Sequence, residues 1–104
     1  MHKLDPELKR IAESLRSQFG SHVRQILFFG SRVRRDATPE SDYDCLLVFD
    51  QVTPDLEAQL DEMASRWLIE KGMLLSLLPL NENDLERLRY EPFLQNARRE
   101  GIAA

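Results

Sequence analysis

Residues 25–49 read QILFFGSRVRRDATPESDYDCLLVF, and this stretch decides the fold. It starts with a short apolar run, residues 25–29, and ends with another, residues 44–49. Short apolar and aromatic runs bounded by turn residues are typical of buried strands. Between the runs, Gly30 predicts a tight turn, and residues 36–41, DATPES, predict a loop. We therefore expect two strands joined by a polar connection.

Before and after these two strands, apolar residues recur at helical spacing. A first helix is predicted from a cap at Asp5 to a stop at Gly20, and a second from a cap at Thr53 to a stop at Gly72. In each case a proline follows the cap, at the first helical position, where its missing N–H has no intrahelical partner to lose. Both helices therefore have a predicted start and a predicted end.

The last third of the chain predicts one more strand and one more helix. Residues 73–80, MLLSLLPL, predict a third buried strand, which is expected to break near Pro79 because proline cannot donate to a strand ladder. A last helix is expected to begin at a cap on Asn81 or Asn83 and to run towards Arg99.

Pro92 is expected to bend or divide that last helix. The order of elements predicts an α/β (α+β) fold, with a small mixed sheet of about three to four strands and helices packed mainly on one face. A chain of 104 residues has room for one small domain, and we expect residues 1–104 to form it.

Composition excludes several classes of protein. A net charge of −4 argues against a general nucleic-acid-binding protein. The longest apolar run, residues 73–78, is too short to span a bilayer, and the polar N-terminus does not predict a signal peptide. One cysteine excludes an internal disulfide framework and a cysteine-cluster metal site. We expect a cytoplasmic protein without a membrane partner.

The turn after the first strand has the composition of a phosphate-binding segment. Gly30 permits close approach to the backbone, and Ser31 adds a hydroxyl at a predicted short helical turn. Arg32, Arg34 and Arg35 add positive charge within the same few residues. The alternative interpretation is a capped surface turn with solvated arginines.

Two acids stand at the start of the second strand. Residues i and i+2 of a strand point to the same face, so the carboxylates of Asp42 and Asp44 can approach one point. Two carboxylates that close raise each other's pKa unless a cation lies between them, and Mg²⁺ prefers such oxygen ligands. The alternative interpretation is a polar strand start with two solvated acids.

Taken together, these features resemble the DNA polymerase β-like nucleotidyltransferase superfamily. The order is strand, Gly-Ser, ten residues, Asp-x-Asp, strand, and it is similar to the superfamily signature. The length and the flanking residues resemble the minimal nucleotidyltransferases, and the likeness continues through Pro92-Phe93-Leu94 and Arg99-Glu100-Gly101. The resemblance implies the nucleotidyltransferase fold and transfer of a nucleoside monophosphate, with AMP from ATP as the expected case.

The resemblance also implies a role for each matching residue. Gly30 and Ser31 match the pair that contacts the β- and γ-phosphates of a nucleoside triphosphate. Asp42 and Asp44 match the catalytic acids that bind one or two Mg²⁺ ions. The arginines that follow Ser31, Arg32 and Arg34, are expected to bind the nucleotide by neutralising charge on the leaving pyrophosphate.

One family feature is missing. Full family sites carry a third acid on the strand after the second helix, where it helps to bind metal and accepts the proton of the attacking hydroxyl. Residues 73–80 contain no acid, and Ser76 stands near the expected position. Glu82, Asp84 or a group from a partner are the alternatives. The absence puts catalysis in doubt but leaves nucleotide binding unaffected.

Two main hypotheses of function follow. In the first, the chain is a Mg²⁺-dependent nucleotidyltransferase; by resemblance it is the antitoxin of a small all-α HEPN-domain toxin, which it silences by modifying a tyrosine. In the second, a weak or inactive nucleotidyltransferase fold acts as a partner- or nucleotide-binding module, as a nucleotide sensor or by contact with another protein. The sequence leaves a HEPN partner and a homo-oligomer both open.

Overall fold

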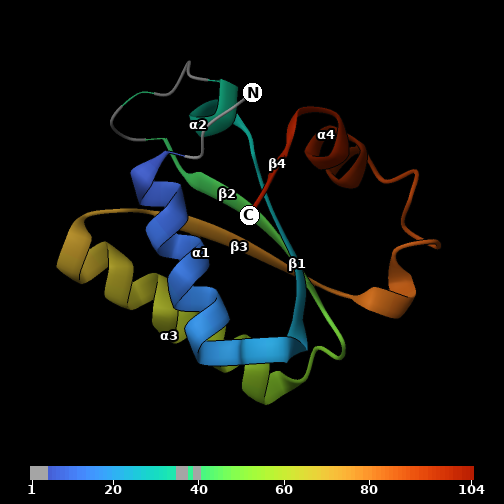
Figure 1. The fold of residues 1–104 in the computed structure, drawn as a ribbon, viewed down its shortest axis with the longest axis horizontal. Coiled ribbons are helices and arrows are strands. Elements are labelled where there is room, and N and C mark those ends of the chain that lie inside the picture. The colour runs from blue at the N-terminus through green and yellow to red at the C-terminus, as the bar shows by residue number, and fades with distance from the viewer. Residues whose placement is uncertain (1–4, 35–37, 39–40) are drawn as a thin grey trace.

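The computed structural model describes residues 5–34, 38 and 41–104, and within them the strands form one mixed sheet (Figure 1). The strands are β1 (Val23–Phe29), β2 (Tyr43–Phe49), β3 (Leu75–Asn81) and β4 (Ile102–Ala103). Their order across the sheet is β3-β2-β1-β4. β2 is antiparallel to β1 and parallel to β3, and β4 is antiparallel to β1. The expected α/β (α+β) fold with a mixed sheet is confirmed.

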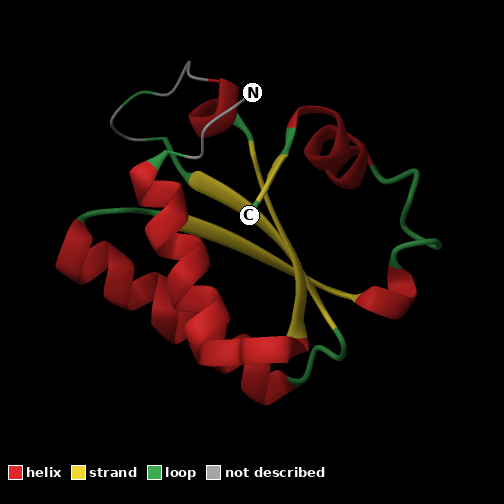
Figure 2. Ribbon diagram, viewed as in Figure 1, coloured by secondary structure: helices red, strands yellow, loops and turns green. Residues whose placement is uncertain are grey.

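Two long helices, α1 (Pro6–Phe19) and α3 (Pro54–Lys71), cover one face of the sheet (Figures 1 and 2). Both begin at the predicted caps. The Asp5 carboxylate accepts from the N–H of Glu7 at 2.8 Å, and the Thr53 hydroxyl accepts from the N–H of Leu56 at 3.1 Å. Each cap satisfies a backbone donor that the first helical turn leaves without an internal acceptor.

The main core lies between these two helices and the sheet. It is built from alternate residues of β1 and β2 and from the apolar faces of α1 and α3. Its largest fully buried members are Phe28, Phe49, Ile11, Leu15, Ile26 and Leu47. Burying a side chain of this kind contributes about 1.5–3 kcal/mol.

A smaller cluster covers the other face of the sheet. Leu94 and Ala97 of α4 (Pro92–Glu100) pack there against Leu27 of β1 and Leu46 of β2. The remaining helical segments are the short α2 (Ser31–Arg34) and two single turns of 3₁₀-helix, η1 (Gly20–His22) and η2 (Glu82–Asp84). The helices therefore lie mainly on one face, as expected, with α4 on the second.

The structure corrects three expectations. β3 continues through Pro79, because β3 is an edge strand, where a missing donor can be tolerated. The last helix begins at Pro92, since proline fits the first helical position but no interior one; residues 85–90 form turns instead. The fourth strand, β4, lies after Gly101, where no strand was predicted.

Within the described residues, no helix carries an apolar stretch of the length that crossing a membrane would require. The predicted loop 36–41 lies largely outside the described residues, as does Arg35.

Candidate functional site

The end of β1 makes the turn that the sequence predicts. Gly30 has a φ of +82°, a conformation that residues with a side chain rarely adopt. Its carbonyl accepts from the N–H groups of Val33 at 3.1 Å and Arg34 at 3.0 Å, which closes the single turn of α2. Ser31 is the first residue of this turn and is partly exposed.

Asp44 lies directly against this turn. Phe29 and Asp44 are paired in the β1–β2 ladder, so Asp44 is beside the end of β1. A methyl group built on Gly30 would lie 2.2 Å from Asp44 Oδ2, too close to be accommodated. The glycine is therefore required by its backbone conformation and by the carboxylate packed on it.

Asp44 resists ionisation. Burial raises the pKa of Asp44 above its ordinary value, the negative charges of Asp42 and Glu100 raise this pKa further, and Arg34 opposes them. The structure thus brings the two predicted acids and the predicted phosphate turn to one end of the sheet. Removing an unfavourable interaction between carboxylates is what a bound cation does.

Ser76 is the neighbour of Asp44 in the parallel β2–β3 ladder. Both residues alternate with members of the main core, Cys45 in β2 and Leu75 and Leu77 in β3. Asp44 and Ser76 therefore share the face of the sheet on which α4 packs. Their neighbouring positions fit the predicted place of a third acid, and this chain has a hydroxyl there.

Glu82 and Asp84 do not reach this site. They follow the carboxyl end of β3, whereas Asp44 and Ser76 stand near the starts of their strands, at the other end of the sheet. Glu82 contacts Arg24 at 3.5 Å, and Asp84 contacts Arg87 at 3.5 Å. Neither is a candidate for the third acid.

The side chains of the two predicted phosphate-binding arginines, Arg32 and Arg34, lie on different sides of the turn. Arg32 donates to the carbonyl of Ser41, at 2.9 Å from Nη2, and its guanidinium lies 4.2 Å from the centre of the Tyr43 ring. Tyr43 belongs to the main core and its hydroxyl donates to Glu7, so Arg32 lies towards α1. Arg34, by contrast, lies on the side of Asp44.

Glu100 is the site residue to which sequence reasoning assigned no role. Its Oε1 accepts from the N–H of Gly30 at 3.0 Å and from Nη1 of Arg34 at 3.0 Å. The signal was present in the likeness of Arg99-Glu100-Gly101 to the end of minimal nucleotidyltransferases. Helical periodicity could not indicate it, because Glu100 is a charged residue at the very end of α4.

The single cysteine, Cys45, is structural. It is fully buried in the main core, and burial strongly raises the pKa of its thiol. A thiol that resists deprotonation is a poor nucleophile.

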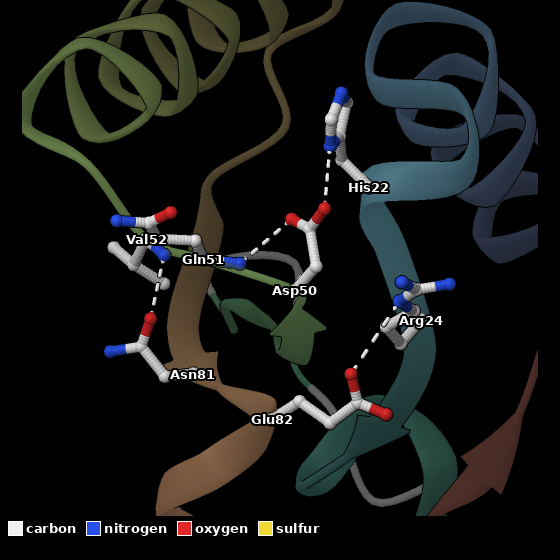
Figure 3. A network of polar contacts seen from close by, with 7 residues as sticks. All are labelled: His22, Arg24, Asp50, Gln51, Val52, Asn81 and Glu82. Atoms are coloured by element: carbon white, nitrogen blue, oxygen red, sulfur yellow. Dashed lines mark hydrogen bonds and ion pairs between the residues drawn. The ribbon is translucent and has the colours of Figure 1, made fainter.

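The opposite end of the sheet carries a second polar cluster (Figure 3). The ionised Asp50 carboxylate accepts from Nδ1 of His22 at 2.7 Å and from the N–H of Gln51 at 2.7 Å. Asn81 Oδ1 accepts from the N–H of Val52 at 2.7 Å, so this amide ties the end of β3 to the segment after β2. The His22–Asp50 and Asn81–Val52 contacts each join two segments that are far apart in the sequence, whereas the Gln51–Asp50 contact is local.

The donor set at the first end fits Mg²⁺ in one way. Among the described residues, no three His, Cys, Asp or Glu side chains are grouped so that they could hold a metal by themselves. Mg²⁺, however, is commonly bound by one or two carboxylates together with water and substrate phosphates. Asp42 and Asp44, whose negative charges repel each other, supply two carboxylates.

Comparison with known proteins defines the class. Residues 8–99 match the family described as nucleotidyltransferase domain, and the chain belongs to this family. The match covers α1 through α4 and includes the Gly30 turn, both acids and Ser76.

The chain is also similar to individual proteins. The chain is 28% identical over 94 residues to MJ0604 of Methanocaldococcus jannaschii, named as a candidate protein adenylyltransferase, and the alignment covers 90% of each chain. The fold of the present chain matches a chain of the crystal structure of the toxin–antitoxin MntA-HpeT with a TM-score of 0.62 at 15% identity. The match covers 91% of the present chain and 69% of the MntA-HpeT chain. A candidate nucleotidyltransferase of Sulfolobus solfataricus matches with a TM-score of 0.52 at 25% identity, over 91% and 73%.

Proposed function

We propose that this protein is a Mg²⁺-dependent adenylyltransferase that transfers AMP from ATP to a side-chain hydroxyl of a partner protein. The observation that carries the proposal is the contact between the Gly30 turn and the Asp44 carboxylate, because it joins a phosphate-binding segment to a metal-binding acid. Membership of the nucleotidyltransferase family supports the reaction class, and the likeness to the candidate protein adenylyltransferase supports AMP and a protein acceptor.

Each residue has a defined part in the proposed reaction. Gly30 and Ser31 bind the β- and γ-phosphates, and Arg34 lies close enough to neutralise charge on them. Asp42 and Asp44 would hold Mg²⁺, which supplies charge stabilisation at the phosphates when bound. Arg32 packs on the Tyr43 ring and donates to the Ser41 carbonyl, so we assign it to holding the backbone at Ser41 and not to binding the phosphates.

The bond changes are those of an in-line displacement. The acceptor hydroxyl oxygen forms a bond to the α-phosphorus, and the bond from that phosphorus to the bridging oxygen of the β-phosphate breaks. Pyrophosphate leaves with the electron pair, and the hydroxyl proton passes to water. No carboxylate stands at Ser76 to accept that proton, so we expect turnover to be slow.

The proposed partner is a small all-α HEPN-domain protein, towards which this chain acts as antitoxin. The fold match to a chain of a toxin–antitoxin structure supports this assignment. In this proposal residues 1–104 act as one domain, and the partner brings the acceptor hydroxyl.

Intact-mass spectrometry tests the proposal. The purified chain is incubated with ATP, Mg²⁺ and the small all-α HEPN-domain protein proposed as its partner. We expect the partner to gain the mass of one AMP with the wild type and none with Asp42→Asn or Asp44→Asn. Asp61→Asn, on the exposed face of α3, is the matched control and should transfer AMP as the wild type does.

A second function is favoured by one observation, the serine beside Asp44 where an acid is expected. In it, the chain neutralises its partner by contact alone. A stable complex with no mass gain, and full neutralisation by Asp42→Asn, would establish this second function and exclude the first.

A further inference from the structure

We infer that Glu100 is a positioning residue for the nucleotide, which holds the Gly30 turn and Arg34 in the arrangement that receives the β- and γ-phosphates. One carboxylate oxygen, Oε1, accepts from both ends of this segment, at 3.0 Å from the Gly30 nitrogen and 3.0 Å from Arg34 Nη1. The inference rests on the nucleotidyltransferase function proposed above. It adds to that function a residue outside the Gly-Ser and Asp-x-Asp motifs.

The segment has little support of its own beyond Val33, which packs partly buried against the main core. α2 has four residues, none of them buried. An isolated helical turn is unstable, since several backbone dihedral angles are fixed for one hydrogen bond. A contact that joins Gly30 to Arg34 across α2 therefore restrains the whole turn.

Glu100 is itself held on two sides. α4 is anchored by Leu94 and Ala97, both fully buried. Directly after Glu100, Gly101 passes so close to Ala97 that an added methyl group would lie 2.0 Å from the Ala97 carbonyl oxygen. Ile102 then pairs with Phe28 of β1. The carboxylate, with a side chain 22% exposed, is thus presented from a fixed backbone.

The charge of Glu100 is needed for Arg34 more than for Gly30. A neutral amide oxygen could accept from the Gly30 N–H, but a charge-assisted bond to a guanidinium is roughly twice as strong as a neutral one. The same charge lies close enough to Asp44 to disfavour its ionisation. A carboxylate at this position therefore carries an electrostatic cost, which is consistent with a positioning role.

The experiment compares the affinity for Mg²⁺–ATP with the affinity for AMP, which lacks the β- and γ-phosphates. The proteins are the wild type, Glu100→Gln, Glu100→Ala and a matched control, Glu62→Ala, which removes a carboxylate–arginine contact of 2.9 Å on the exposed face of α3. We expect Glu100→Ala to weaken Mg²⁺–ATP binding about tenfold. AMP binding should change less than about twofold, a difference of a few tenths of a kcal/mol.

Glu100→Gln should fall between the wild type and Glu100→Ala, because the amide oxygen still accepts from Gly30. Glu62→Ala should match the wild type for both ligands. If Glu100→Ala weakens ATP and AMP equally, Glu100 has a general structural role and the inference is overturned. Unchanged ATP binding in Glu100→Ala overturns it as well.

Amide hydrogen exchange separates a failure of this inference from a failure of the proposed function. A wild type that binds no Mg²⁺–ATP refutes the proposed function. Faster exchange at the amides of Gly30, Val33 and Arg34 in Glu100→Ala, and not in Glu62→Ala, still establishes that Glu100 holds the turn. Unchanged exchange at these amides overturns the inference whatever the nucleotide result.

Discussion

At the Gly30 end of the sheet, Asp44 lies among the negative charges of Asp42 and Glu100, whereas at the opposite end Asp50 lies 2.7 Å from the His22 ring. The pKa of Asp44 is raised above its ordinary value, mainly by burial. The pKa of Asp50 is lowered, mainly by the hydrogen bond from His22. Because carboxylates with a raised pKa are common at functional sites, we expect the chemistry at the first end of the sheet and a structural role at the second.

The connectivity explains how the two ends come to differ. β1 ends and β2 begins at the Gly30 end (Figure 1). At the other end, short segments join β2 to α3 and follow β3, and their side chains bond to neighbouring backbone groups, as Asn81 does to Val52 (Figure 3).

The largest effect on the contrast should come from Gly30→Ala. The substitution forces an alanine to a φ of +82° and drives its methyl group to 2.2 Å from Asp44 Oδ2. We expect a loss of about 2–4 kcal/mol in the free energy of unfolding, from left-handed strain and overpacking together. Mg²⁺–ATP binding should be lost with it, and urea denaturation with calorimetry measures both.

Gly72→Ala is the matched control for this prediction. Gly72 has a φ of +65°, but a methyl group built on it meets nothing within 4 Å. It should therefore cost about 1 kcal/mol, the left-handed strain alone, and leave nucleotide binding intact. Equal losses in the two variants would mean that the Asp44 contact does not matter.

Ser76→Asp sharpens the contrast, because it adds a negative charge to the Gly30 end of the sheet, where Asp42, Asp44 and Glu100 already lie. Its carboxylate would stand beside Asp44 in the β2–β3 ladder. Without Mg²⁺ the melting temperature should fall, because like charges on neighbouring strands repel. With Mg²⁺ and ATP the rate of AMP transfer should rise about 10²-fold or more, within the range of about 10²–10⁴ that a positioned general base supplies.

Ser76→Asn is the control for Ser76→Asp, since it adds similar volume without charge. Its rate of AMP transfer should not rise above that of the wild type. A rate that stays flat in Ser76→Asp while Mg²⁺–ATP still binds would indicate that the fold serves binding alone, and would favour the second candidate function.

The sequence predicted the Gly30 end better than the rest of the fold. The glycine, the two acids and the serine each follow from strand alternation and from the spacing of a known signature, which are local properties. Arg32 could not be separated from Arg34, because the side to which each turns depends on Tyr43 and Glu100, which no local pattern brings together.

The same limitation explains the structural corrections. β3 passes through Pro79 only because no strand pairs with its outer edge among the described residues, and edge position is a property of the sheet. β4 has two residues, too few for a periodicity, and exists because α4 returns the chain to β1. Glu100 reaches Gly30 across 70 residues of sequence for the same reason.

The smallest expected effects are the changes in melting temperature on replacing Asp44 or Asp50 by asparagine, and these changes have opposite signs. The folded protein binds a proton at Asp44 more tightly than the unfolded chain does, so ionisation of Asp44 opposes folding once the pH exceeds the ordinary range of an aspartate. Asp44→Asn should therefore raise the melting temperature at neutral pH without Mg²⁺. The difference should vanish at a pH below the ordinary aspartate pKa, where Asp44 is protonated in both states.

Asp50→Asn should do the reverse. Ionised Asp50 stabilises the fold above the ordinary aspartate pKa, and this contribution is lost as the pH falls through its lowered folded pKa. The variant should melt below the wild type at neutral pH and converge with it in acid, in thermal melts followed by circular dichroism. Because Asp50 lies at the opposite end of the sheet from the proposed nucleotide site, its variant should keep the stabilisation by Mg²⁺–ATP that Asp44→Asn loses. Melting shifts of the same sign in both variants would refute the contrast between the two ends.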